Sequence, residues 1–188
     1  MKRLKRITGM VLLLMSISVA LSAQKKITGI YRTMNDYLGN QLTYAGDSSH
    51  TPSIKLYTLA PKSYVTIHYK GAPIHLNKNE IFAYRLTNGE VYRIIGNHSY
   101  QVLNNNALLL LYKRKIPTSP KERPEDQFKY YFSANNGALQ TLTAWNVKQA
   151  FADHPTLSDQ IDALFKRDTE LLAYDSFHKM YKLEWLLK

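Results

Sequence analysis

Hydrophobic and polar residues alternate along several segments in the middle of the chain, between residues 53 and 142. In residues 63–69, for example, Val65, Ile67 and Tyr69 fall on one side of an extended backbone, and a period of two is typical of a half-buried β-strand. Runs of strand length, either alternating or continuously apolar, recur over residues 53–58, 63–69, 72–76, 80–86, 90–95, 99–103, 108–113, 128–133 and 139–142. Because the connections are short, the pattern predicts an antiparallel meander of about six to eight strands, either open or curled toward a barrel.

Several of these connections carry turn residues of known preference. Lys70-Gly71 is a plausible two-residue turn, and Asn88-Gly89 is the strongest short signal for a β-hairpin. Consecutive strands are therefore expected to pair with each other.

A helical spacing replaces the alternation near both ends of the chain. Thr33 and Asp36 have the spacing of a capping box, which predicts a short N-terminal helix that ends at Gly39. Thr143 begins a second helix, and Asp168 begins a helix that reaches nearly to the C-terminus.

A further capping-box spacing at residues 156–159 predicts one more helix between these two. The chain is thus expected to form a single α+β domain over residues 24–188, with a sheet over residues 53–142 and about three helices over residues 143–187.

The first 23 residues have the layout of a cleavable export signal. Four Lys and Arg side chains precede an apolar run, which ends in small residues before Gln24. Cleavage is expected between Ala23 and Gln24, with a cut after Ala20 as the alternative. A retained membrane anchor is the competing interpretation, although the run is short and serines interrupt it. The chain has no cysteine, which excludes a lipoprotein, and no second apolar run is long enough to span a membrane. The product is expected to be periplasmic or secreted.

Removal of this signal changes the charge that a partner would meet. The full chain has 25 Lys and Arg against 14 Asp and Glu, a net charge of +11. Four of the cations lie in residues 1–23, so 21 minus 14 leaves +7 for the mature chain. This charge favours negatively charged partners, such as an acidic envelope glycan or lipid phosphate. The reduction from +11 weakens the case for nucleic acid.

The densest basic stretch after the signal is Lys113-Arg114-Lys115, with Lys121 and Arg123 in the segment that follows. Aromatic residues, among them Tyr130 and Tyr131, flank it, so sugar rings or bases could stack beside anionic contacts. These residues are the candidate binding site, although acidic residues nearby partly cancel the charge.

Two constellations suggest chemistry, and neither is complete. The Lys70-Gly71 turn would place His68 opposite Pro73 and bring His75 onto the same face, but zinc needs at least three protein ligands. His68 and His75 are thus the candidate ligands of a metal site that the sequence does not otherwise predict.

Asp175, Ser176 and His178 are the residue types of a hydrolase triad. On a helix, however, Ser176 would point away from His178, so the serine could not donate a hydrogen bond to that histidine. The chain also lacks a glycine-rich phosphate loop, H-E-x-x-H and G-x-S-x-G, and no cofactor is predicted.

Several short segments resemble uncharacterised exported proteins of Bacteroidetes-type bacteria. They are the Leu-Ser-Ala-Gln cleavage site and residues 29–33, 36–38, 80–85, 130–133, 142–143, 146–148 and 174–182. The resemblance implies a location in the bacterial envelope, and no activity comes with it.

The expected function is that of a non-enzymatic envelope protein that binds another envelope protein or a glycan through a tyrosine-rich sheet. The chain has 14 tyrosines, and tyrosine offers a large, stiff contact surface with a polar tip. One alternative is a hydrolase acting on envelope polymers, which would need a deep pocket. Another is electrostatic binding of a polyanion.

Overall fold

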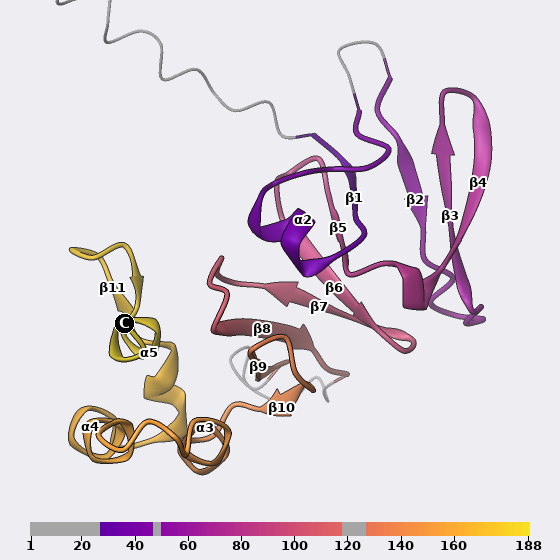
Figure 1. Ribbon diagram of the computed structural model, residues 1–188. Helices are drawn as coiled ribbons and strands as arrows, with labels where there is room; N and C mark the ends of the chain where they lie inside the picture. The colour runs from indigo at the N-terminus through magenta and orange to yellow at the C-terminus, as the bar shows by residue number, and fades with distance from the viewer. Residues whose placement is uncertain (1–26, 47–49, 118–126) are drawn as a thin grey trace, which may run out of the picture.

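The meander predicted from the alternating pattern forms the central layer of the computed structural model, which describes residues 27–46, 50–117 and 127–188 (Figure 1). The predicted export signal lies outside the described residues. The central sheet is antiparallel, with strand order β1-β5-β6-β7-β8-β9-β10. Its strands are β1 (Gly29–Tyr31), β5 (Ala83–Arg85), β6 (Val91–Ile95), β7 (His98–Val102), β8 (Leu109–Lys115), β9 (Phe128–Ala134) and β10 (Gln140–Thr141).

The sheet is open, so the alternative of a barrel-like closure was wrong. The first three strands after residue 52, β2 (Ser53–Lys55), β3 (Tyr64–Tyr69) and β4 (Ala72–Asn77), form a second sheet of their own. A 3-10 turn, η1 (Lys78–Glu80), separates β4 from β5. In a continuous meander β4 would pair with β5. Here β5 pairs instead with β1, a strand that the alternating pattern did not predict. Short strands at both edges, rather than closure, end the sheet.

The predicted turns form as their residues require. Lys70 and Gly71 both have positive φ (51° and 83°), as a type I′ turn needs, and Tyr69 pairs with Ala72 across them. Gly89 and Gly96 also have positive φ, at the turns that join β5 to β6 and β6 to β7.

Two helical regions lie on either side of this sheet. The short helix α2 (Met34–Leu38) begins with the Thr33–Asp36 capping box, in which each residue's backbone amide donates to the other's side chain (2.9 and 3.1 Å). Helices α3 (Ala144–Ala150) and α4 (Leu157–Leu164) follow β10, and Thr143 caps α3.

The long helix predicted from Asp168 is absent from the described residues. In its place lie the 3-10 turn η3 (Asp168–Leu172), a hairpin of β11 (Tyr174–Asp175) and β12 (Met180–Tyr181), and the short helix α5 (Lys182–Leu186). Asp175 Oδ1 accepts hydrogen bonds from the amides of Phe177 and His178, which stabilises a turn at the point where a helix would have continued.

Three apolar clusters hold the layers together, and two of them lie on the same face of the central sheet. We call this face 1. Near its β1–β5–β6 end, face 1 packs against the β2–β3–β4 sheet through residues such as Val65 and Ile67. Near its β8–β9 end, it packs against the helical layer through residues such as Leu111 and Val147. Face 2 is covered by α2 over a third cluster that includes Tyr112.

Candidate functional site

A row of directly paired residues crosses face 1 from one edge strand almost to the other. Directly opposite residues of antiparallel strands place their side chains on the same face. Both ends of the row are covered, because Ile30 and Tyr84 lie under the small sheet, while Tyr130 packs against the helical core. Between the two covers, the described residues leave the middle of the row open and polar. In order, the row is Ile30, Tyr84, Tyr92, Gln101, Lys113 and Tyr130.

This uncovered middle forms a groove of about 480 Å³, which we call the lysine groove. Lys78, Lys113 and Lys115 supply cationic side chains, and Arg114 also lines the groove. Its other lining residues include Gln101 and the aromatic residues Tyr84, Tyr92 and Phe128, and none of the described residues that line it is Asp or Glu. A groove with several cations and no acid among these lining residues is suited to an anionic ligand.

Aromatic rings lie beside the lysines. Tyr84 and Tyr92 stack with ring centroids 5.4 Å apart, and the ammonium group of Lys113 lies 3.8 Å from the centroid of the Phe128 ring. Such a contact holds a lysine in place without neutralising it, since the ring contributes no full negative charge.

Among the described residues, the Glu90 carboxylate is hydrogen-bonded to two residues that line the groove. It accepts hydrogen bonds from Gln101 Nε2 and from the Tyr92 hydroxyl, both at 3.1 Å. Burial and the neighbouring Glu90 carboxylate raise the pKa of Tyr92 to about 12. The tyrosine therefore stays a neutral hydrogen-bonding group throughout the physiological range.

The structure divides the basic stretch predicted as one binding site. Lys113 and Lys115 lie on face 1. Arg114 also lines the lysine groove, but its guanidinium group lies over the ring of Tyr100, a face 2 residue, and contacts His98 Nδ1 at 3.0 Å. Alternation along β8 is the physical reason. The two tyrosines divide in the same way, since Tyr131 packs with the face 2 cluster and Tyr130 with the helical core. Lys121 and Arg123 lie outside the described residues.

Lys78 is the lysine of this groove that the sequence did not single out. It belongs to η1, and its ammonium group donates to Asn97 Oδ1 at 3.0 Å. Lys78 is 35 positions from Lys113 in the chain, and only the packing of the small sheet on face 1 brings the two to one groove.

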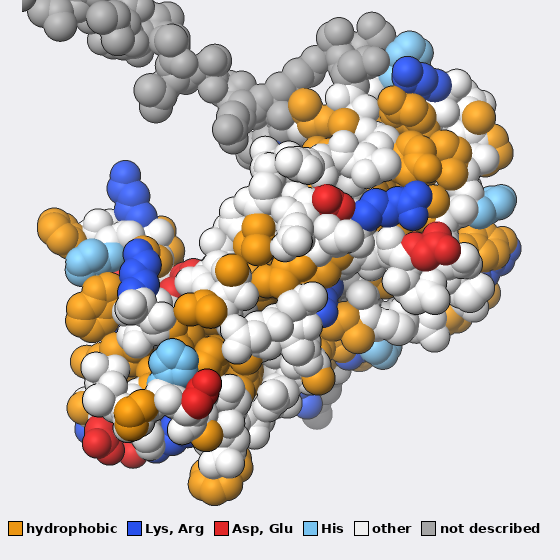
Figure 2. Space-filling view, in the orientation of Figure 1, with side chains coloured by type: hydrophobic (Ala, Val, Ile, Leu, Met, Phe, Trp, Pro, Cys, Tyr) orange, Lys and Arg blue, Asp and Glu red, His pale blue; other side chains and the backbone are white. Residues whose placement is uncertain are grey.

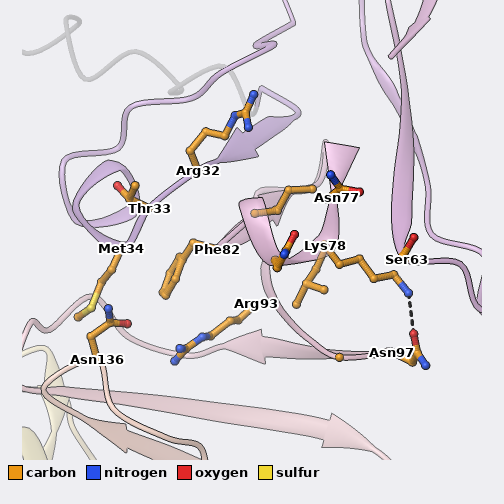
Figure 3. A pocket seen from close by; sticks show the side chains of 14 residues that line it. Arg32, Thr33, Met34, Ser63, Asn77, Lys78, Phe82, Arg93, Asn97 and Asn136 are labelled. Carbon is orange, nitrogen blue, oxygen red and sulfur yellow. Dashed lines mark hydrogen bonds between the residues drawn. The ribbon is translucent and has the colours of Figure 1, made fainter. Parts of the chain in front are cut away.

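A second and larger cleft, of about 870 Å³, adjoins the lysine groove (Figure 3). The two share Lys78, Ile94 and Asn97, and the hydrogen bond between Lys78 and Asn97 lies at their boundary. We call it the arginine cleft, because Arg93 and Arg32 line it. Neither arginine was singled out from the sequence. A signal was present for Arg93, since it occupies the same face as Val91 and Ile95 in a strand where an apolar residue is expected.

The two histidines proposed as metal ligands lie on the β3–β4 hairpin in the register expected, with Thr66 opposite His75 and His68 opposite Pro73. Both are exposed. The Thr66 hydroxyl lies 2.9 Å from His75 Nδ1, which occupies one of the ring nitrogens. Within residues 27–46, 50–117 and 127–188, no three His, Cys, Asp or Glu side chains gather closely enough to hold a metal ion.

The Asp175–His178 pair forms, although on a hairpin and not on a helix. His178 Nδ1 lies 2.6 Å from Asp175 Oδ2, and this hydrogen bond holds the pKa of Asp175 below its usual range. Asp175, Ser176 and His178 line neither the lysine groove nor the arginine cleft.

The tyrosines do not form the exposed face that was expected for binding. Of the 14 tyrosines, only Tyr174 is exposed. Eleven of the others lie in the three apolar clusters on both faces of the sheet, and Tyr57 and Tyr64 are half-buried outside them. Hydrophobic side chains instead reach the surface over the C-terminal layer, as Figure 2 shows. Trp145 and Phe177 there are 70% and 87% exposed.

No helix in the described part of the chain has the length and apolar character needed to cross a membrane. Comparisons with models of protein families, with curated proteins and with solved structures gave no match.

Proposed function

We propose that this chain is an exported, non-enzymatic protein of the bacterial envelope that binds an acidic glycan in the lysine groove. The observation that carries the proposal is the meeting of Lys78, Lys113 and Lys115 in one groove whose described lining residues include no acid. The export signal in residues 1–23 supports the location, because acidic polysaccharides are components of the cell surface.

The groove suits a sugar polymer in more than its charge. Tyr84, Tyr92 and Phe128 present aromatic surface, on which the apolar faces of sugar rings pack. Gln101 and Ser99 add neutral hydrogen-bonding groups of the kind that fix a ligand's orientation. A lipid headgroup would use the lysines alone, so the rings and amides favour a glycan.

The test compares two doubly substituted proteins that lose the same charge. One carries Lys113→Gln and Lys115→Gln in the groove, and the control carries Lys182→Gln and Lys188→Gln, both exposed near the C-terminus. Binding of a uronic acid oligosaccharide is measured by calorimetry. Each lysine contributes about 1 kcal/mol if it lies near 4 Å from a ligand charge in water, so the groove variant should bind about 30-fold more weakly. The control variant should bind like the unmodified protein.

Salt and ligand class complete the test. Raising the ionic strength from about 0.1 M to about 1 M shortens the Debye length from about 10 Å to about 3 Å, and binding should weaken. Equal loss in both variants, insensitivity to salt, or equal binding of a neutral oligosaccharide would each contradict the proposal. Binding to anionic vesicles in preference to the oligosaccharide would replace the glycan by a lipid phosphate.

A further inference from the structure

Arg93 occupies an unusual position for a cation, because the groups that hold it are neutral. Its Nη1 donates to the Tyr112 hydroxyl at 2.5 Å and to Ser133 Oγ at 3.1 Å. Its guanidinium group also lies over the Phe82 ring, 4.8 Å from the centroid. Tyr112 and Ser133 are only 0% and 1% exposed, so the anchoring hydroxyls belong to the rigid core of the sheet.

The guanidinium group therefore retains its charge and part of its hydrogen-bonding capacity. It forms no ion pair with a carboxylate of the described residues, whereas the neighbouring Arg32 lies 3.6 Å from Glu80. An arginine carries five N–H donors, and the two on Nη1 are used by Tyr112 and Ser133. The described residues supply no acceptor to Nε or Nη2, and neither atom is sealed from solvent. This free edge has the two parallel donors that bind planar oxyanions bidentately.

The surroundings of Arg93 match that chemistry. The arginine cleft is lined by Arg32, Thr33, Asn97 and Asn136 in addition to Arg93, and no Asp or Glu occurs among its described lining residues (Figure 3). Hydroxyl and amide groups supply neutral donors around a central cation. The aromatic surface of Phe82 lowers the local dielectric constant, which strengthens a charge-assisted hydrogen bond.

We propose that Arg93 anchors an oxyanion-binding site in the arginine cleft, where its Nε–Nη2 edge takes the carboxylate, sulfate or phosphate group of a small ligand. Tyr112 and Ser133 act as positioning residues, because they hold the guanidinium plane before the ligand arrives. The site does not depend on the lysine groove, since its anchor lies on face 2 of the sheet.

The first experiment uses the unmodified mature protein and the NMR signals of its arginine Nε–H groups. Titration with acetate, sulfate and inorganic phosphate in turn distinguishes the three ligand classes. The Arg93 signal should shift and saturate with at least one of them, while the signal of the exposed Arg167 shifts no more than bulk ionic strength requires. Equal, unsaturable shifts at Arg93 and Arg167 would overturn the proposal.

Substitutions then separate a bidentate site from charge alone. Arg93→Lys keeps the charge and loses the planar edge, so we expect about tenfold weaker binding of the anion. The fold should survive, because the Tyr112 and Ser133 hydroxyls remain hydrogen-bonded to each other at 2.9 Å. Arg167→Lys is the matched control and should leave binding unchanged. Ser133→Ala should weaken binding by a few-fold without any change in charge.

These outcomes are distinguishable from failure of the proposed function. The protein with Lys113→Gln and Lys115→Gln should retain the saturable shift at Arg93 even if it no longer binds the oligosaccharide. Unchanged anion affinity in Arg93→Lys, with the protein folded, would show that Arg93 serves packing alone.

Discussion

Leu111 is one of the residues through which the central sheet packs against the C-terminal layer, and its truncation tests that contact. Leu111 lies on β8, is 0% exposed, and shares one core cluster with residues of three helices, among them Val147, Ile161 and Leu183. Replacing it by alanine removes three buried carbon atoms and leaves a cavity beneath all three helices. Fully buried Leu→Ala substitutions cost about 2.7–5 kcal/mol, with the larger values where the site cannot collapse. Because Leu111 is packed between the central sheet and the helical layer, we expect Leu111→Ala to lower the free energy of unfolding by about 3–4 kcal/mol.

Urea unfolding measured with two probes gives the assay. The protein has two tryptophans, Trp145 on α3 and Trp185 on α5, so tryptophan fluorescence reports the C-terminal layer. Circular dichroism reports the sheet as well. If the layers unfold together, Leu111→Ala should shift both transitions to lower urea by the same amount.

Leu110→Ala provides the comparison. Leu110 is also 0% exposed, but it lies on face 2 in the cluster that α2 covers. It should cost a similar free energy through a different core. A cost below about 1 kcal/mol for Leu111→Ala alone, or a fluorescence transition that separates from the sheet transition in the unmodified protein, would refute the packing of the helices on face 1.

Three further predictions follow from local contacts. Thr33→Ala removes the hydroxyl that caps α2 and should lower the free energy of unfolding by about 1 kcal/mol in urea titrations, whereas an unchanged free energy of unfolding would show that the capping box does not stabilise α2. Because burial and Glu90 raise the pKa of Tyr92 from 10.0 to about 12, its contribution to stability is present below pH 10 and is lost as the pH rises toward 12. Glu90→Gln should lower the pKa of Tyr92 and so narrow the pH range over which this stability is lost. The titration is followed by tyrosinate absorbance, and the part that disappears in Tyr92→Phe is the part due to Tyr92. His178→Ala should raise the depressed pKa of Asp175 toward 3.8. The stability that the unmodified protein loses as the pH falls through the folded pKa of Asp175 should then be absent. Carboxyl-carbon NMR measures the pKa, and an unchanged value would exclude the His178 hydrogen bond as the main cause of its depression.

Local signals in the sequence determined the elements whose formation needs only near neighbours. The Lys70-Gly71 turn and the alternation on either side of it specify that Thr66 faces His75, because a two-residue turn leaves only one register for its hairpin. Thr33 and Asp36 specify the start of α2 in the same way, since each caps the other three residues away. The helix predicted from Asp168 failed because its helical spacing competed with the turn that Asp175 stabilises through its side chain.

The tertiary structure decided which of these elements meet. Nothing in the alternation distinguishes a strand of the central sheet from one of the β2–β3–β4 sheet, because both have one buried face. The pairing of β1 with β5 separates the two sheets. The lysine groove forms where Leu56, Thr58 and Lys78, from segments next to the small sheet, lie against face 1 of the central sheet. Lys78 and Lys113 are neighbours in that groove for a reason that lies in this long-range packing. Local sequence determines the form of each element, whereas burial of its apolar face against a distant partner determines its place.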